Sequence, residues 1–110
     1  MVQRVIVEEK QRSFVKDSCN SRCSLQLLLF LGRHPHARFS QLAIVHAVDA
    51  RRADVEKALR NLQERGLVMM WNADNGLPFY SLTGDEALSR QVMELMSLDW
   101  WQYHLMLDEL

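Results

Sequence analysis

The sequence has few cysteines, prolines and glycines, and it has no apolar segment long enough to span a membrane. Its 110 residues include only 2 Cys, 2 Pro and 4 Gly. Two cysteines do not make a disulfide framework, so a reducing compartment suits this chain. The amino-terminal segment MVQRVIVEEK lacks the apolar core of a signal peptide. We therefore expect a cytoplasmic protein without a membrane partner, and the length predicts one domain.

Positive charge is almost absent from the second half of the chain. Residues 1–65 carry 12 Lys and Arg against 7 Asp and Glu, a net charge of +5. Residues 66–110 carry 1 against 7, a net charge of −6, and no Lys or Arg lies between Arg65 and Arg90. The overall charge of −1 hides this division. The distribution of charge is therefore a better guide to nucleic-acid binding than its total.

The sequence also lacks the patterns that catalysis requires. It has no glycine-rich phosphate loop, no nucleophile with an organised base, and no paired carboxylates outside the acidic tail. We predict that the protein is not an enzyme and holds neither cofactor nor metal. One alternative stays open, because Cys19, Cys23, His34 and His36 lie close in sequence and could sense a metal or redox state.

The first third of the chain predicts a strand followed by helices. The β-branched run QRVIVEE suggests an edge strand, and residues 9–20 have weak helical periodicity. The segment SLQLLLFLG is apolar almost all round, which predicts a helix covered on more than one side. Gly32 stands where the end of this helix favours a residue that tolerates positive φ. Pro35 then disfavours helix at His34.

Capping residues and turn formers divide the remainder. Ser40 predicts the start of a short helix over 41–48, and Asp49 is the candidate N-cap of a longer one that ends at Gly66. The turn formers at 74–76 predict a hairpin between residues 67–72 and 79–82. Thr83 and Glu86 form a capping box, which opens a last helix running nearly to Leu110.

Three segments, FSQLAIVHAVD, VEKALRNLQERGLV and GLPFYSLTGDEA, carry a resemblance to a known family. Over about residues 24–90 the chain resembles the winged helix-turn-helix of transcriptional regulators of the MarR, ArsR and PadR kind. The resemblance implies a mainly α fold with a small β-hairpin (α+β) and a long C-terminal dimerisation helix. The single domain would span 1–110, with an N-terminal extension (1–20), the helix-turn-helix and wing (21–82) and the C-terminal helix (83–110).

The resemblance also implies a recognition helix at residues 50–65 in the DNA major groove and a wing tip at 73–78. On a helical wheel, the side of this helix away from its apolar stripe presents cations that can contact phosphate or guanine, and an asparagine that can pair with adenine. Residues at the amino end of the preceding helix can anchor phosphates. The predicted DNA contacts are Arg38, Ser40, Arg51, Arg52, Lys57 and Asn61. The wing has no cation, so we interpret it chiefly as structural.

The last helix carries a wide apolar and aromatic stripe, which predicts a partner helix from a second copy. The predicted interface residues are Val92, Met96, Trp100, Trp101, Tyr103 and Leu107. Two alternatives remain: the stripe folds back on the apolar helix near residues 24–32, or its aromatic side chains line an effector pocket between subunits.

These patterns together predict a homodimeric transcriptional regulator that binds double-stranded DNA. The alternative function is a winged-helix module for protein–protein interaction, with an acidic C-terminal half that faces a basic partner and no DNA binding.

Overall fold

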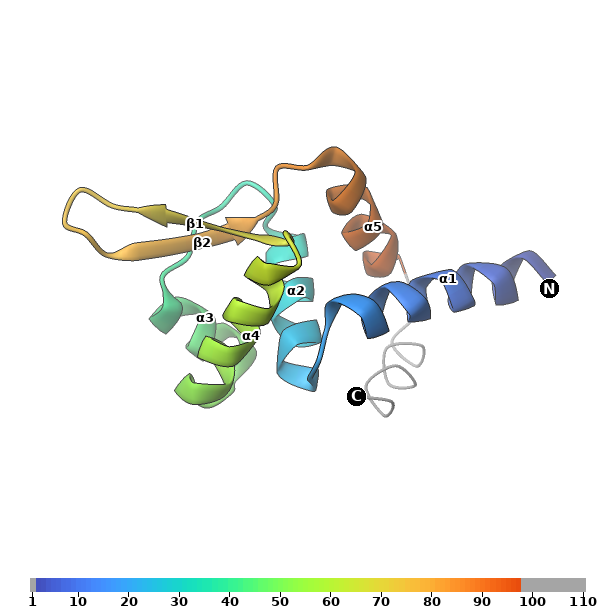
Figure 1. Ribbon diagram of the computed structural model, residues 1–110, viewed down its shortest axis with the longest axis horizontal. Helices are drawn as coiled ribbons and strands as arrows, with labels where there is room; N and C mark the ends of the chain where they lie inside the picture. The colour runs from blue at the N-terminus through green and yellow to red at the C-terminus, as the bar shows by residue number, and fades with distance from the viewer. Residues whose placement is uncertain (1, 98–110) are drawn as a thin grey trace.

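The computed structural model describes residues 2–97, with side chains from Lys10 onward. The described elements, in chain order, are α1 (Val2–Ser18), α2 (Arg22–Arg33), α3 (Gln41–Val48), α4 (Arg52–Glu64), β1 (Val68–Asn72), β2 (Pro78–Leu82) and α5 (Glu86–Met96). The prediction of a mainly helical fold with one small antiparallel hairpin is confirmed. The hairpin and α1 project in opposite directions from the body of the molecule (Figure 1).

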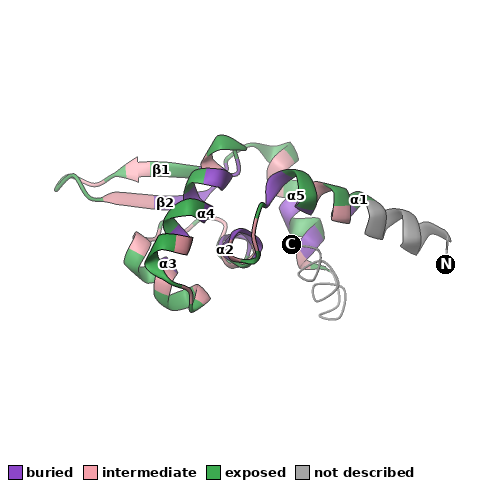
Figure 2. Ribbon diagram, turned by 60° about the horizontal axis from the view of Figure 1, so that its bottom comes forward, coloured by how far each residue is buried: buried purple, intermediate pink, exposed green. Residues whose placement is uncertain are grey.

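Helix α2 forms the centre of the hydrophobic core. Four of its five leucines, at positions 25, 27, 28 and 31, have no exposed surface, and the helix contacts α3, α4, α5 and β2. Figure 2 shows α2 as a largely buried helix surrounded by the other elements. The prediction that this apolar helix is covered on several sides is therefore confirmed.

Gly32 has a different role from the one predicted. It lies inside α2, which His34 caps, and it is not among the described glycines with positive φ. A Cβ atom at Gly32 would lie 2.9 Å from Val92 Cγ1 and 3.2 Å from Met96 Sδ. Glycine is thus present because α5 crosses close to α2, and a side chain would overpack this contact.

The amino-terminal segment is a helix rather than the predicted edge strand. Helix α1 runs without a break through the β-branched run at residues 3–9. Farther along it, Gln11, Val15 and Ser18 are buried, and this spacing of about one helical turn places them on one face. Gln11 Nε2 donates a hydrogen bond of 3.1 Å to the Glu94 carbonyl on α5. Strand propensity depends on packing neighbours, and here the neighbouring element is a helix.

Three helix N-caps were predicted, and the prediction is correct for Ser40 but wrong for Asp49 and Thr83. Ser40 caps α3, because its hydroxyl accepts from the Ala43 N–H at 3.2 Å. Asp49 does not cap α4: it has a left-handed backbone (φ 51°) and ends α3, and Arg51 takes the N-cap position.

The start of α5 lies slightly later than the predicted capping box. Thr83 Oγ1 accepts from the Asp85 N–H at 3.1 Å, and Asp85 Oδ1 accepts from the Leu88 N–H at 3.0 Å. Asp85, rather than Thr83, is therefore the N-cap, and Glu86 is the first helical residue. A threonine and a nearby aspartate offer competing caps, and sequence spacing alone does not decide between them.

The hairpin strands have nearly the predicted bounds, and Val68 lies opposite Leu82 and Asn72 opposite Pro78. Gly76 supplies the positive φ of the tip. A third segment joins β2, because the N–H and carbonyl of Phe39 both bond to Tyr80 at 2.8 Å. This pairing fixes the chain just before α3 against the hairpin.

Helix α5 packs inward on the same chain. Val92 has no exposed surface, so its predicted role at a dimer interface is wrong: it fills the contact with Gly32. Met96 is half-buried. The other predicted interface residues lie outside the described residues, and they are Trp100, Trp101, Tyr103 and Leu107. No helix within residues 2–97 has the length and hydropathy of a bilayer span.

Candidate nucleic-acid interface

Helices α3 and α4 form the helix-turn-helix, joined by the turn at residues 49–51. Helix α4 divides cleanly into two faces. Its buried face packs on α2 and carries Val55, Ala58, Leu59, Asn61 and Leu62. The opposite face is exposed and carries most of its charged side chains. This face is the candidate nucleic-acid interface.

Arg51 and Arg52 lie at the amino end of α4 and extend into solvent. Their side chains are 88% and 81% exposed. Arg51 Nε lies 3.2 Å from Asp54 Oδ2, and Arg52 Nε lies 3.6 Å from Glu56 Oε1. Exposed ion pairs of this kind contribute little free energy, roughly 0–1 kcal/mol, so a phosphate can compete for either guanidinium.

Lys57 is exposed on the same face, as predicted, and Arg60 is exposed one turn farther along. Glu56 and Arg60 have the i, i+4 spacing typical of a helix ion pair. In the structure Glu56 Oε1 instead pairs with Arg52 and accepts from Gln41 Nε2 at 3.1 Å, which links α4 to α3. Arg60 is therefore a further exposed cation on this face, and it was not among the predicted DNA contacts.

Asn61 does not lie on the exposed face, and its prediction as a base-reading residue is wrong. Only 8% of the surface of Asn61 is exposed. Asn61 Oδ1 accepts from Ser24 Oγ at 3.0 Å and from the Asn20 N–H at 3.3 Å. The side chain thus satisfies polar groups where α4 meets α2 and the residues before it, a structural role that makes it inaccessible to a base.

Arg38 and Ser40 flank Phe39 just before α3. The Arg38 guanidinium lies over the Trp71 indole of β1, with Cζ 3.6 Å from the ring centroid. Ser40 Oγ is occupied as an acceptor by the α3 cap, but its O–H remains a potential donor to phosphate. Both residues come just before α3, and the amino end of a helix favours anions.

The hairpin contrasts with these helices because residues 66–89 contain no Lys or Arg. Asp74 and Asn75 are exposed at its tip, and Leu77 and Met70 are 57% and 50% exposed. A tip of this composition has no positive charge with which to bind phosphate.

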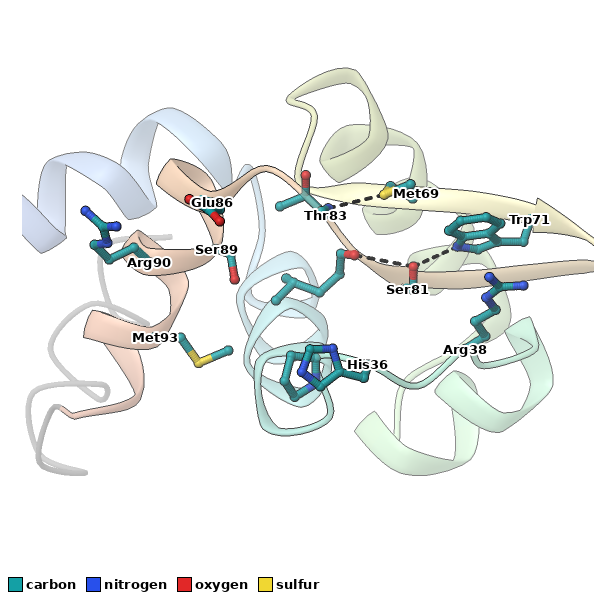
Figure 3. A pocket seen from close by; sticks show the side chains of 13 residues that line it. His36, Arg38, Met69, Trp71, Ser81, Thr83, Glu86, Ser89, Arg90 and Met93 are labelled. Atoms are coloured by element: carbon teal, nitrogen blue, oxygen red, sulfur yellow. Dashed lines mark hydrogen bonds between the residues drawn. The ribbon is translucent and has the colours of Figure 1, made fainter.

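A pocket of about 750 Å³ lies between the hairpin, the residues before α3 and α5 (Figure 3). Met69 and Trp71 line it from β1, and Glu86 and Arg90 from α5. Arg38 lies at its edge beneath the Trp71 ring. Arg38 is the one predicted DNA contact among the residues that line this pocket.

The cysteine and histidine cluster is not assembled into a binding site in residues 10–97, where no group of three or more His, Cys, Asp and Glu side chains comes together. His34 instead packs its ring against Phe30 and Phe39. Burial raises the pKa of the Cys19 thiol to about 12. Burial and, to a smaller extent, the Asp54 charge raise the pKa of Cys23. Both shifts disfavour the thiolate that metal binding and redox chemistry need.

No protein-family model matches the sequence, and no curated protein matches it either. Solved structures do match. MepR, a transcription regulator of the Staphylococcus aureus multidrug efflux pump MepA, is 18% identical, with a TM-score of 0.65 over 99% of this chain and 82% of MepR. A MepR–DNA complex gives a TM-score of 0.64 at 18% identity, covering 96% of this chain and 83% of that one.

MarR from Escherichia coli gives a TM-score of 0.61 at 16% identity, covering all of this chain and 85% of MarR. The match spans the helix-turn-helix, the hairpin and the flanking helices. The chain therefore has the winged-helix fold of these regulators. At this level of identity the comparison establishes the fold, while the function depends on the residues of the site.

Proposed function

We propose that this chain is a DNA-binding transcriptional regulator that places α4 in the major groove. The observation that carries the proposal is the exposure of Arg51 and Arg52, at 88% and 81%, at the amino end of the second helix of a helix-turn-helix. In such motifs the first residues of this helix approach base edges and phosphates. The fold shared with MepR, which has been solved in a complex with DNA, supports the same placement.

The remaining cations support this orientation. Lys57 and Arg60 continue the exposed face of α4, and Arg38 precedes α3. Bidentate guanidinium groups can read guanine or bind phosphate, whereas Lys57 would bind phosphate as a point charge. In this mechanism α4 reads the groove, and the amino end of α3 fixes the register on the backbone.

A salt-dependent titration tests the proposal. Fluorescence anisotropy with a random-sequence duplex at low and moderate salt should show binding that weakens as salt rises. The double variant Arg51→Ala/Arg52→Ala should weaken low-salt binding by roughly tenfold or more, because two phosphate or base contacts are lost. Absence of binding at low salt, or binding unchanged in this variant, would refute the proposal.

A charge-matched control separates local contacts from net charge. Arg33 ends α2 and Arg90 lies on α5, so Arg33→Ala/Arg90→Ala removes the same charge away from α3 and α4. We expect this control to bind within about twofold of the unmodified protein, since distant exposed charges are screened.

We also propose that the protein is a homodimer that binds a two-fold DNA site through one α4 from each subunit. The sequence pattern supports this, because Trp100, Trp101 and Tyr103 continue an apolar stripe beyond α5. Sedimentation of the full chain should show a dimer, and Trp100→Ala/Trp101→Ala should shift it toward the monomer. A variant that stays dimeric at the same concentration would exclude these tryptophans from the interface.

Protein–protein interaction is the second candidate function. It is favoured by the hairpin, which exposes Leu77 and Asp74 and has no cation for phosphate. The same titration decides between the two, because an interaction module predicts no duplex binding even at low salt.

A further inference from the structure

Arg38 and Trp71 come from distant parts of the chain and form a stacked pair at the edge of the candidate interface (Figure 3). Arg38 belongs to the segment before α3, and Trp71 belongs to β1 of the hairpin. The guanidinium carbon lies 3.6 Å from the centroid of the indole ring, a distance typical of direct cation–π contact. The pair therefore joins the helix-turn-helix to the wing.

The indole is held in place by a buried hydroxyl. Trp71 Nε1–H donates to Ser81 Oγ on β2 at 2.8 Å, and Ser81 is only 6% exposed. Ser81 Oγ in turn donates to the Leu82 carbonyl at 3.3 Å. Because the ring is bonded at its edge to the partner strand, its face is presented in one fixed orientation.

The backbone of Arg38 is also constrained. Its neighbour Phe39 makes two backbone hydrogen bonds of 2.8 Å to Tyr80, and Ser40 then begins α3. Arg38 is thus held by the sheet on one side and by the Trp71 ring on the other. Stacking engages the face of the guanidinium and leaves its in-plane N–H groups directed outward, where they can form bidentate bonds with a phosphate.

We propose that Trp71 is a positioning residue for DNA binding: it orients the Arg38 guanidinium toward a backbone phosphate beside the amino end of α3. This inference rests on the proposed function. It gives the cation-free wing a part in binding, because the wing supplies the aromatic surface and the segment before α3 supplies the charge. A side chain that is ordered in advance loses less entropy when it binds.

A double-mutant cycle on the full chain tests whether Trp71 acts through Arg38. With a random-sequence duplex at low salt, Trp71→Ala should weaken binding by about two- to fivefold, the range expected for an exposed cation–π pair. Arg38→Ala should weaken it by roughly tenfold and lower the slope of log affinity against log salt by about 0.9, the value for one phosphate. In the Arg38→Ala background, Trp71→Ala should then have no further effect.

Two further variants separate positioning from a general structural role. Trp71→Phe keeps an aromatic face and should retain most of the affinity lost in Trp71→Ala. Met70→Ala removes a neighbouring side chain that is 50% exposed on the opposite face of β1, and should leave binding unchanged. Urea denaturation of each variant gives the folded fraction, to which the affinities are normalised.

The outcomes distinguish this inference from the proposed function. If the unmodified protein binds DNA but Trp71→Ala has no effect, or has the same effect with and without Arg38, the positioning role is refuted and the proposed function stands. If the unmodified protein does not bind duplex at low salt, both are refuted.

Discussion

Helix α4 and the hairpin are adjacent, contacting elements with opposite ways of using their exposed surface. The helix buries one apolar face and exposes Arg52, Lys57 and Arg60 on the other. The hairpin buries Val68 and Leu82 near its base but exposes methionines, Leu77 and acidic or amide side chains toward its tip. Positive charge is thus concentrated on the helices, whereas the hairpin exposes mainly apolar and acidic or amide side chains. The division shows that a winged helix need not carry cations on both elements.

The largest expected effect is a loss of stability when a polar side chain on the buried face of α4 is removed. Asn61→Ala removes the acceptor of Ser24 Oγ and of the Asn20 N–H in a buried environment. We expect it to lower the free energy of unfolding by about 1–3 kcal/mol, the cost of leaving buried polar groups unsatisfied. Urea denaturation followed by circular dichroism measures this change. The DNA affinity of the folded fraction should stay the same.

Lys57→Ala is the matched control, since Lys57 lies on the exposed face of the same helix. It should leave the free energy of unfolding within about 0.5 kcal/mol of the unmodified protein. It should, however, weaken DNA binding. Equal stabilities of the two variants would show that the Asn61 network contributes nothing to folding.

Local signals predicted most of the fold. The Ser40 cap, Gly66 and the turn formers at 74–76 set α3, the end of α4 and the hairpin. These signals operate within a few residues, so they can be recognised without tertiary information. The apolar sequence of α2 likewise predicted that the helix is central.

The errors in the fold arose where a distant element decides the outcome. The segment at 3–9 has strand propensity but continues α1, and Gly32 serves a crossing with α5 rather than a helix end. Neither the packing partner of a helix nor the distance of closest approach is encoded in local spacing.

The candidate site was predictable in part. Exposure of Arg51, Arg52 and Lys57 followed from helical periodicity, because these residues lie opposite the apolar stripe. Asn61 lies at the border between the faces, where the residues before α2 cover it. The Arg38–Trp71 pair had no signal in the sequence, since only the folded sheet brings its members together. Whether these residues contact DNA stays a prediction.

A cation at the wing tip would remove the contrast between the two elements. Backbone hydrogen bonds between Ala73, Gly76 and Leu77 close the turn, so Asp74→Lys should preserve the hairpin. We expect it to raise duplex affinity by about two- to fivefold at low salt, because it replaces a repelled charge with one that can bind phosphate. Fluorescence anisotropy measures the gain, and Asp74→Asn separates lost repulsion from new attraction. An unchanged affinity would mean that the wing tip does not reach the duplex.

The smallest expected effect concerns an ion pair on the exposed face of α4. Glu56 is the carboxylate that pairs with Arg52 at 3.6 Å, so it competes with phosphate for this guanidinium. Glu56→Gln keeps an acceptor for Gln41 but weakens the competition, and should raise duplex affinity by about twofold at low salt. Glu64→Gln removes the same charge at the carboxyl end of α4 and should have a smaller effect. Anisotropy titrations at two salt concentrations measure both variants. Equal gains in affinity would assign the effect to net charge. A larger gain for Glu56→Gln would show that loss of the Glu56 charge frees the Arg52 guanidinium to bind DNA.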